Sequence, residues 1–175
     1  KKKDREGERE GKKEVGGILK ERGITLTWFC IGSTANYFVC QKVKELLEQY
    51  QLQDKFILLV VKKNPYPYMK QADAVMVLSD FESWSFVITE AKVLGVPVIA
   101  TATSGAKEQL VDGKTGIITS FEPKEIAEQI LEYLNNPLKK EQICKNLTGF
   151  SAKQDVIKEF QGFFSYFRMR KENVR

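Results

Sequence analysis

The chain has 175 residues, 42% of them hydrophobic, which suits one α/β domain with a real core and leaves no room for a second full domain. Its net charge of +5 comes from the two ends, because residues 15–161 carry equal numbers of basic and acidic side chains. This distribution argues against a basic nucleic-acid-binding face on the folded body, and the absence of histidine excludes Ser-His-Asp or Cys-His catalysis and a histidine-rich metal site.

The chain opens on a charged segment. Residues 1–14 hold seven basic and five acidic side chains and almost nothing apolar, so we expect a solvated, flexible segment there. The first helical pattern, over residues 15–22, precedes the first apolar run. Doubly wound domains normally open on a strand. We therefore expect either that such a strand lies upstream of Lys1, at the centre of the parent protein's sheet, or that the fold manages without it.

Five apolar runs predict five strands, and helical patterns separate them. Near-unbroken hydrophobicity of this kind is typical of parallel strands covered on both faces. The runs cover residues 24–31, 56–61, 74–78, 96–100 and 117–119. Their alternation with helices predicts an α/β fold, a Rossmann-like doubly wound parallel sheet with helices on both faces and right-handed crossovers.

The last third of the chain is predicted to be helical. One helix is expected to begin at Pro123 and to end at Asn135-Asn136-Pro137, with a short helix after it. We thus divide the chain into the charged segment 1–14, an α/β core over 15–150, and a C-terminal helix with a basic tail over 151–175. In that last segment aromatic residues are followed by basic ones. Such a helix could pack on protein or lie on a membrane surface, and we favour packing on protein.

Three cysteines, Cys30, Cys40 and Cys144, stand at no metal-ligand or redox spacing, and their number is odd. They indicate free thiols in a reducing, cytoplasmic setting. No apolar run approaches the roughly 18 residues of a membrane span, and no signal peptide opens the chain.

The stretch 72–116 carries the chemistry. Glu82 and Glu90 are separated by seven residues, between an apolar run and a helix that ends at Gly95-Val96-Pro97. Three further blocks surround them in order, over residues 64–73, 97–101 and 104–116. Together the blocks resemble the paired-glutamate signature of retaining GT-B glycosyltransferases, and their setting resembles the C-terminal donor-binding domain of glycosyltransferase family 4 (group 1). The resemblance covers about residues 55–135.

The physics of such a site can be stated apart from the family. A parallel sheet binds ligands at the carboxyl ends of its strands, where helix N-termini point amide hydrogens at phosphate. The helix that begins near Ser85 offers such an N-terminus. A carboxylate one or two turns along it, Glu90, can accept the ribose hydroxyls of a nucleoside diphosphate. Glu82, in the loop before the helix, would face the transferred sugar as the catalytic carboxylate.

The resemblance implies further donor-binding positions. Around the helix start these are Ser83, Ser85, Phe86 and Val87. The loop Val61, Lys62, Lys63 and Asn64 either meets the nucleobase through its backbone or is an ordinary surface turn. Ser104 and Gly105 would let the backbone approach the sugar, and Arg9 with Lys13 would neutralise the diphosphate. Tyr66 and Tyr68 are expected to be packing aromatics.

The resemblance implies the donor half of a retaining hexosyltransferase that binds a nucleotide sugar and uses no cofactor or metal. The acceptor, a sugar or lipid-linked molecule of bacterial polysaccharide, capsule or lipopolysaccharide biosynthesis, would be held by an N-terminal domain that this chain lacks, so the chain alone should transfer poorly. The full-length enzyme would be cytoplasmic or peripheral to the inner face of the membrane. The alternatives are a non-catalytic flavodoxin-like partner-binding domain, which lacks its acids here, and a GT-B epimerase or phosphorylase.

Overall fold

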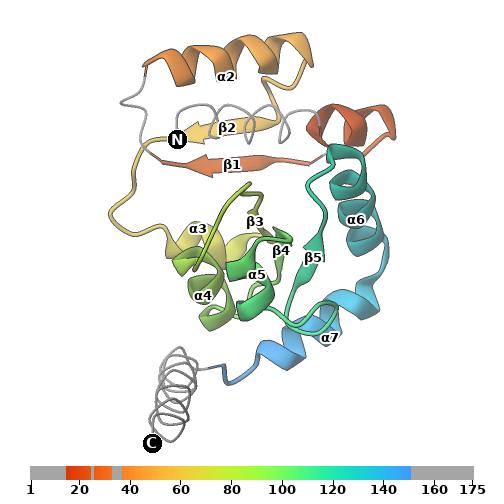
Figure 1. The fold of residues 1–175 in the computed structure, drawn as a ribbon. Helices are drawn as coiled ribbons and strands as arrows, with labels where there is room; N and C mark the ends of the chain where they lie inside the picture. Colours follow the sequence, from red (N-terminus) through yellow and green to blue (C-terminus); the bar gives the residue numbers. More distant parts are fainter. Residues whose placement is uncertain (1–14, 25, 33–36, 151–175) are drawn as a thin grey trace, which may run out of the picture.

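The computed structural model of the protein describes residues 15–24, 26–32 and 37–150, except for the side chains of residues 37–39. Within these ranges strands and helices alternate along the chain, as the apolar runs predicted (Figure 1). A helix over residues 15–21 comes first. The elements after it are β1 (Trp28–Ile31), α2 (Tyr37–Gln49), β2 (Phe56–Leu59), α3 (Tyr66–Gln71), β3 (Val75–Val77), α4 (Phe86–Val93), β4 (Val98–Thr101), α5 (Ser104–Gln109), β5 (Ile117–Thr119), α6 (Pro123–Asn135) and α7 (Pro137–Leu147).

Neighbouring strands all pair in parallel, which confirms the predicted sheet type. β1 pairs with β2, with Trp28 opposite Phe56. β4 lies between β3 and β5, with Val75 opposite Val98. Among the described residues the strands form two separate ladders, β1–β2 and β3–β4–β5. The expectation of an opening strand at the centre of the sheet stays a prediction.

The β3–β4–β5 sheet is covered on both faces, as a doubly wound fold requires. Successive side chains of a strand point to opposite faces, and all four residues of β4 are buried. Val98 and Ala100 pack with α4 and α5. Ile99 packs on the other side with α6, α7 and the helix of residues 15–21. Burial of an aliphatic side chain of this size stabilises the fold by about 1.5 to 3 kcal/mol, so β4 is the centre of the core.

The helix of residues 15–21 joins the two ladders. Its Val15 and Leu19 are fully buried in the cluster that contains α6, and Figure 1 shows it beside that helix. Its other side lies against the β1–β2 unit, because a Cβ added at Gly16 would come within 3.0 Å of Leu52 Cδ1 and 3.3 Å of Phe56 Cε2. The glycine therefore lets the helix approach Leu52 and the start of β2.

The β1–β2 ladder itself contributes none of the described buried residues. The middle residues of both strands are exposed, with 57% of Phe29 and 39% of Ile57 accessible to solvent. Trp28 stacks on Phe56, with ring centroids 5.3 Å apart, and it also packs against the core cluster that contains α6. The predicted strand 24–31 is also shorter than expected, because Ile24 and Leu26 pack against the core cluster before β1 begins.

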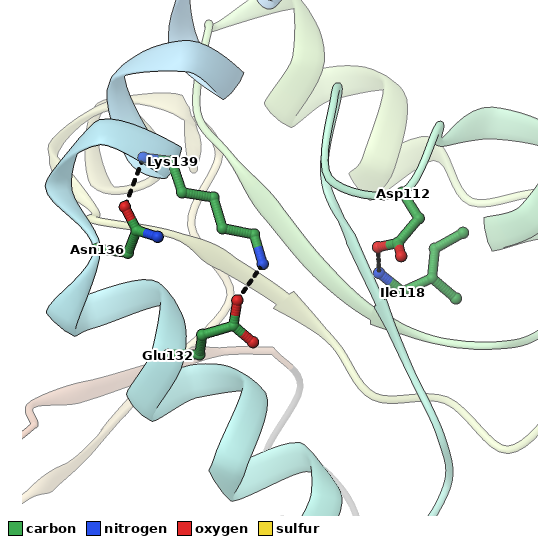
Figure 2. Close-up of polar contacts among 5 residues, drawn as sticks. All are labelled: Asp112, Ile118, Glu132, Asn136 and Lys139. Atoms are coloured by element: carbon green, nitrogen blue, oxygen red, sulfur yellow. Dashed lines mark hydrogen bonds and ion pairs between the residues drawn. The ribbon is translucent and has the colours of Figure 1, made fainter.

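Hydrogen bonds between residues close in the sequence fix three turns between the elements. α4 ends in a Schellman motif: Gly95, with φ +70°, donates its N–H to Lys92, and Val96 donates to Ala91. In the turn before β5, Asp112 accepts the Ile118 N–H at 2.8 Å (Figure 2). Figure 2 also shows the junction of α6 and α7, where Asn136 Oδ1 accepts the Lys139 N–H at 3.0 Å and the Lys139 ammonium lies 2.8 Å from Glu132. α6 ends where the sequence predicted.

Candidate functional site

The signature loop follows β3 at its carboxyl end. β3 ends at Val77 and α4 begins at Phe86, so Glu82 lies in the loop between them and Glu90 lies one turn into the helix. Both glutamates are half-buried. α5 begins beyond the carboxyl end of the neighbouring strand β4. Because β3 and β4 are parallel, the loop and the start of α5 leave the sheet at the same edge.

The start of α5 holds the Glu82 end of this loop. Gly105 donates its backbone N–H to the Glu82 carbonyl at 2.8 Å, and Ser104 Oγ donates to the same carbonyl at 3.2 Å. A Cβ at Gly105 would lie 2.7 Å from the Ser83 carbonyl carbon. The missing side chain therefore admits the loop backbone itself. The expected approach of a sugar to Ser104 and Gly105 stays a prediction.

The end of α5 holds the other end of the loop. Gln109, only 4% exposed, accepts the Ser85 N–H at 2.8 Å and donates to the Ser85 carbonyl at 2.9 Å. Its amide also donates to Thr89 Oγ1 at 2.9 Å, and the buried Lys92 ammonium donates to its backbone carbonyl at 2.8 Å. Sequence reasoning missed Gln109. It stands between Glu108 and Leu110 in a segment for which no helix was predicted, and no sequence pattern marked its role.

The two helices at this edge differ in how their N-termini are satisfied. Thr103 caps α5, because its hydroxyl accepts the Ala106 N–H at 3.2 Å. Ser85 begins α4 without a side-chain cap, and the next two residues are open to solvent, Phe86 at 75% and Val87 at 43%. First-turn amides have no partner inside a helix and carry the positive end of its dipole. The start of α4 can therefore accept an anion.

Glu90 is hydrogen-bonded by Tyr66, which was expected to be a packing aromatic. The Tyr66 hydroxyl donates to Glu90 Oε1 at 3.1 Å. This hydrogen bond, together with the negative charge of Glu90, raises the pKa of Tyr66 above its ordinary value. Tyr66 and Tyr68 are 43% and 39% exposed, so the expectation that they are packing aromatics is wrong. The proline-rich segment that carries them forms α3, where part of each ring remains in solvent.

The loop after β2 is tied to the same region through α3. Asn64 Oδ1 accepts the Tyr66 N–H at 3.1 Å, which links the predicted base-binding loop to the residue that contacts Glu90. Val61 is 66% exposed, and the Lys62 ammonium lies 5.9 Å from the Tyr68 ring centroid. Lys63 is exposed. The predicted residues Arg9 and Lys13, and the whole segment 151–175, lie outside the described residues.

A cavity of about 560 Å³ lies away from the glutamates. It sits at the opposite edge of the sheet, where the chain enters β1 and β3 and where α6 ends. Its lining is formed by Gly23, Ile24, Leu26, Asp73, Tyr133, Leu134, Pro137 and Lys140. We place the candidate site at the carboxyl edge instead, because the glutamate pair and the uncapped helix start are there. In the described part of the chain no cluster of three potential metal-ligating side chains occurs, and no described helix is long and apolar enough to cross a membrane.

Fold and site together define a class of protein. A parallel sheet with helices on both faces, and a loop and helix start at the carboxyl edge of that sheet, define a doubly wound α/β domain, which binds ligands at this edge. The particular family follows from the sequence: residues 39–149 match the model of the glycosyl transferases group 1. The match covers well over half of the chain, and the chain belongs to this family.

Relatives and solved structures agree with this assignment. The chain is 27% identical over 120 residues to N-acetyl-alpha-D-glucosaminyl L-malate synthase of Bacillus anthracis, covering 68% of the chain and 30% of that protein. A glycosyltransferase from Rickettsia africae has a TM-score of 0.74 at 19% identity, over 86% of this chain and 42% of that one. Anabaena HepE in complex with UDP-glucose has a TM-score of 0.70 at 20% identity, over 87% and 44%. The chain thus spans less than a third of the curated relative and less than half of each solved structure.

Proposed function

We propose that this chain is the donor-binding half of a retaining glycosyltransferase, which binds a nucleotide diphosphate sugar for transfer of the glycosyl unit to a sugar or lipid-linked acceptor. Membership of the glycosyl transferases group 1 supports glycosyl transfer. The UDP-glucose complex of the structurally similar HepE supports a nucleotide sugar as donor. The observation that carries the proposal is the uncapped start of α4 between Glu82 and Glu90.

Each part of the site has a role in this proposal. The first-turn amides of α4 bind the diphosphate, assisted by Arg9 and Lys13. Glu90 accepts the ribose hydroxyls in charge-assisted hydrogen bonds. The backbone of residues 61–64 contacts the base. Glu82 lies on the sugar side, where a carboxylate stabilises the positive charge that develops on the sugar as its bond to the diphosphate breaks.

The acceptor side belongs to a longer protein. In the proposal an N-terminal domain binds the acceptor, and the site functions when the two domains enclose the donor. For that enzyme we propose a role in bacterial polysaccharide assembly at the cytoplasmic face of the membrane, where it would transfer the glycosyl unit to sugar or lipid-linked acceptors. Donor binding, by contrast, is a property that this chain can be tested for directly.

The test is calorimetric titration of the chain with UDP. Glu90→Ala should weaken UDP binding at least about a hundredfold, because it removes two charge-assisted hydrogen bonds that each contribute about 1.5 to 3 kcal/mol. Glu125→Ala is the matched control, since this exposed acid lies in the first turn of α6 on the opposite face of the sheet. Thermal melts should be alike for all three proteins. Equal UDP affinity of wild type and Glu90→Ala would remove the proposed site.

A further inference from the structure

Tyr66 connects two parts of the proposed site that lie far apart in the sequence. Its backbone N–H is accepted by Asn64 in the loop after β2, at 3.1 Å. Its hydroxyl reaches across to α4 and donates to Glu90 Oε1, also at 3.1 Å. A single residue thus fixes the distance between the end of the predicted base loop and the carboxylate on α4.

The chemistry of the contact suits a carboxylate that must also bind a ligand. A carboxylate has two oxygens and about four acceptor sites. The single O–H of Tyr66 uses one site on Oε1, and the remaining sites stay available for two ribose hydroxyls. The phenol ring has only two rotatable side-chain bonds, whereas the glutamate has three. A contact that orders Glu90 before the ligand arrives reduces the conformational entropy lost on binding.

The same contact contributes little that the fold needs. Tyr66 is 43% exposed and belongs to neither buried cluster. α3 is joined to α4 by a separate hydrogen bond, from the Lys70 ammonium to the Leu94 carbonyl at 3.3 Å. Exposed polar pairs add little to folding stability. The position of the Tyr66 hydroxyl is therefore better explained by a role in orienting the Glu90 carboxylate than by a role in packing.

We propose that Tyr66 is a positioning residue for nucleoside recognition: its hydroxyl holds the Glu90 carboxylate in the orientation that accepts the two ribose hydroxyls. This inference rests on the proposed function, and it adds a residue outside the glutamate signature. The proposed role depends on the ribose hydroxyls of the ligand. Loss of the hydroxyl should affect only ligands that have ribose hydroxyls for Glu90 to bind.

The test uses two ligands and two matched variants. Tyr66→Phe removes the hydroxyl, and Tyr68→Phe makes the same change on the same short helix, at a ring that faces Lys62 instead. Calorimetry with UDP should show about three- to tenfold weaker binding by Tyr66→Phe, the value of one hydrogen bond. Tyr68→Phe should bind as wild type does. With 2′,3′-dideoxyuridine 5′-diphosphate, wild type and Tyr66→Phe should bind equally.

The possible outcomes separate the two claims. If wild type binds UDP and Tyr66→Phe binds it equally or more tightly, the positioning role is overturned while the donor site stands. The positioning role is also overturned if Tyr66→Phe loses as much affinity for the dideoxy ligand as for UDP, because a general distortion would do that. If wild type binds no UDP, the proposed function fails and this inference fails with it.

A second readout needs no ligand. The tyrosinate absorbance of wild type minus that of Tyr66→Phe reports the titration of Tyr66 alone. Because the hydrogen bond to Glu90 and the charge of Glu90 raise the pKa of Tyr66, Glu90→Ala should lower it towards its ordinary value. Glu125→Ala should leave it unchanged. An unchanged titration in Glu90→Ala would show that the two side chains are not in contact, and would overturn the inference.

Discussion

Tyr133 shows how one hydroxyl can make folding depend on pH. The side chain is 1% exposed at the end of α6, and its hydroxyl donates to the Asp73 carbonyl at 2.7 Å, just before β3. Burial raises the pKa of Tyr133 far above its ordinary value, and the charges of Cys144 and Asp73 add to the shift. The folded protein therefore binds this proton more tightly than the unfolded chain does.

Linkage then gives a signed prediction. The stability due to the Tyr133 proton is complete below pH about 10, the pKa of an unfolded tyrosine, and falls by up to about 1.4 kcal/mol per pH unit above it. Tyr133→Phe should be about 1 kcal/mol less stable than wild type at pH 8, because it loses the hydrogen bond. The difference should shrink as the pH passes 10. Urea denaturation of both proteins from pH 8 to 11 measures it, and a difference independent of pH would contradict the assignment.

Single residues of the site were predictable from sequence only where a pattern of neighbouring residues identifies them. Glu82 and Glu90 were identified because three further blocks, over residues 64–73, 97–101 and 104–116, surround them in the order of a known signature. Gln109 and Tyr66 were missed or misplaced for a physical reason. An amide that hydrogen-bonds backbone 24 residues away, and a phenol that reaches another helix, take their roles from tertiary contacts. Neither residue differs from an ordinary one in the sequence pattern.

At the scale of elements, periodicity predicted the long helices and the strand order along the chain, and it missed α3 and α5. Each of these helices has only six residues, which is under two turns and too short to show an apolar stripe. α3 contains Pro67, and α5 opens with Ser104-Gly105. Neither was therefore predicted as a helix. They form because tertiary contacts fix them: α5 packs Ala106 into the core and holds the signature loop at both ends.

A substitution at Gln109 tests whether α5 holds the signature loop in place. Gln109→Leu keeps the volume but leaves the buried N–H of Ser85 without its side-chain partner, whereas the Ser85 carbonyl still accepts the Thr89 N–H at 3.3 Å. One unpaired buried group costs about 1 to 3 kcal/mol, so the free energy of unfolding should fall by about 1 to 3 kcal/mol. Gln142→Leu, on the exposed side of α7, should change it by less than about 0.5 kcal/mol.

Urea denaturation measures both Gln109→Leu and its control. UDP titration of Gln109→Leu, under conditions where it remains folded, should also show weaker binding, because the start of α4 is no longer held. A variant as stable as wild type would mean that Ser85 finds other partners and that α5 does not hold the loop.

At the scale of the whole molecule, the two halves of the sheet differ in burial. β4 is buried along its whole length, whereas the middle residues of β1 and β2 are exposed. Between the halves, the residues that lead into β1 and β3 line the cavity of about 560 Å³. The sequence predicted parallel strands correctly, but the runs in β1 and β2 are as apolar as those of β4. Composition alone could not show which strands are enclosed, because that depends on which helices cover them.

This asymmetry predicts that the β1–β2 unit opens at a lower free energy than the β3–β4–β5 core. Local opening follows the amount of buried apolar contact. The β1–β2 strands contact the core through Trp28 and through the helix of residues 15–21, against which Leu52 and Phe56 lie. Native-state hydrogen exchange in increasing urea should release the amides of Trp28–Ile31 and Phe56–Leu59 well before those of Val98–Thr101. Within α4 and α5 exchange should follow β4, since both helices pack on it. Simultaneous release of all these amides at one urea concentration would show instead that the two halves unfold as a single cooperative unit, with the helix of residues 15–21 binding them more tightly than their burial indicates.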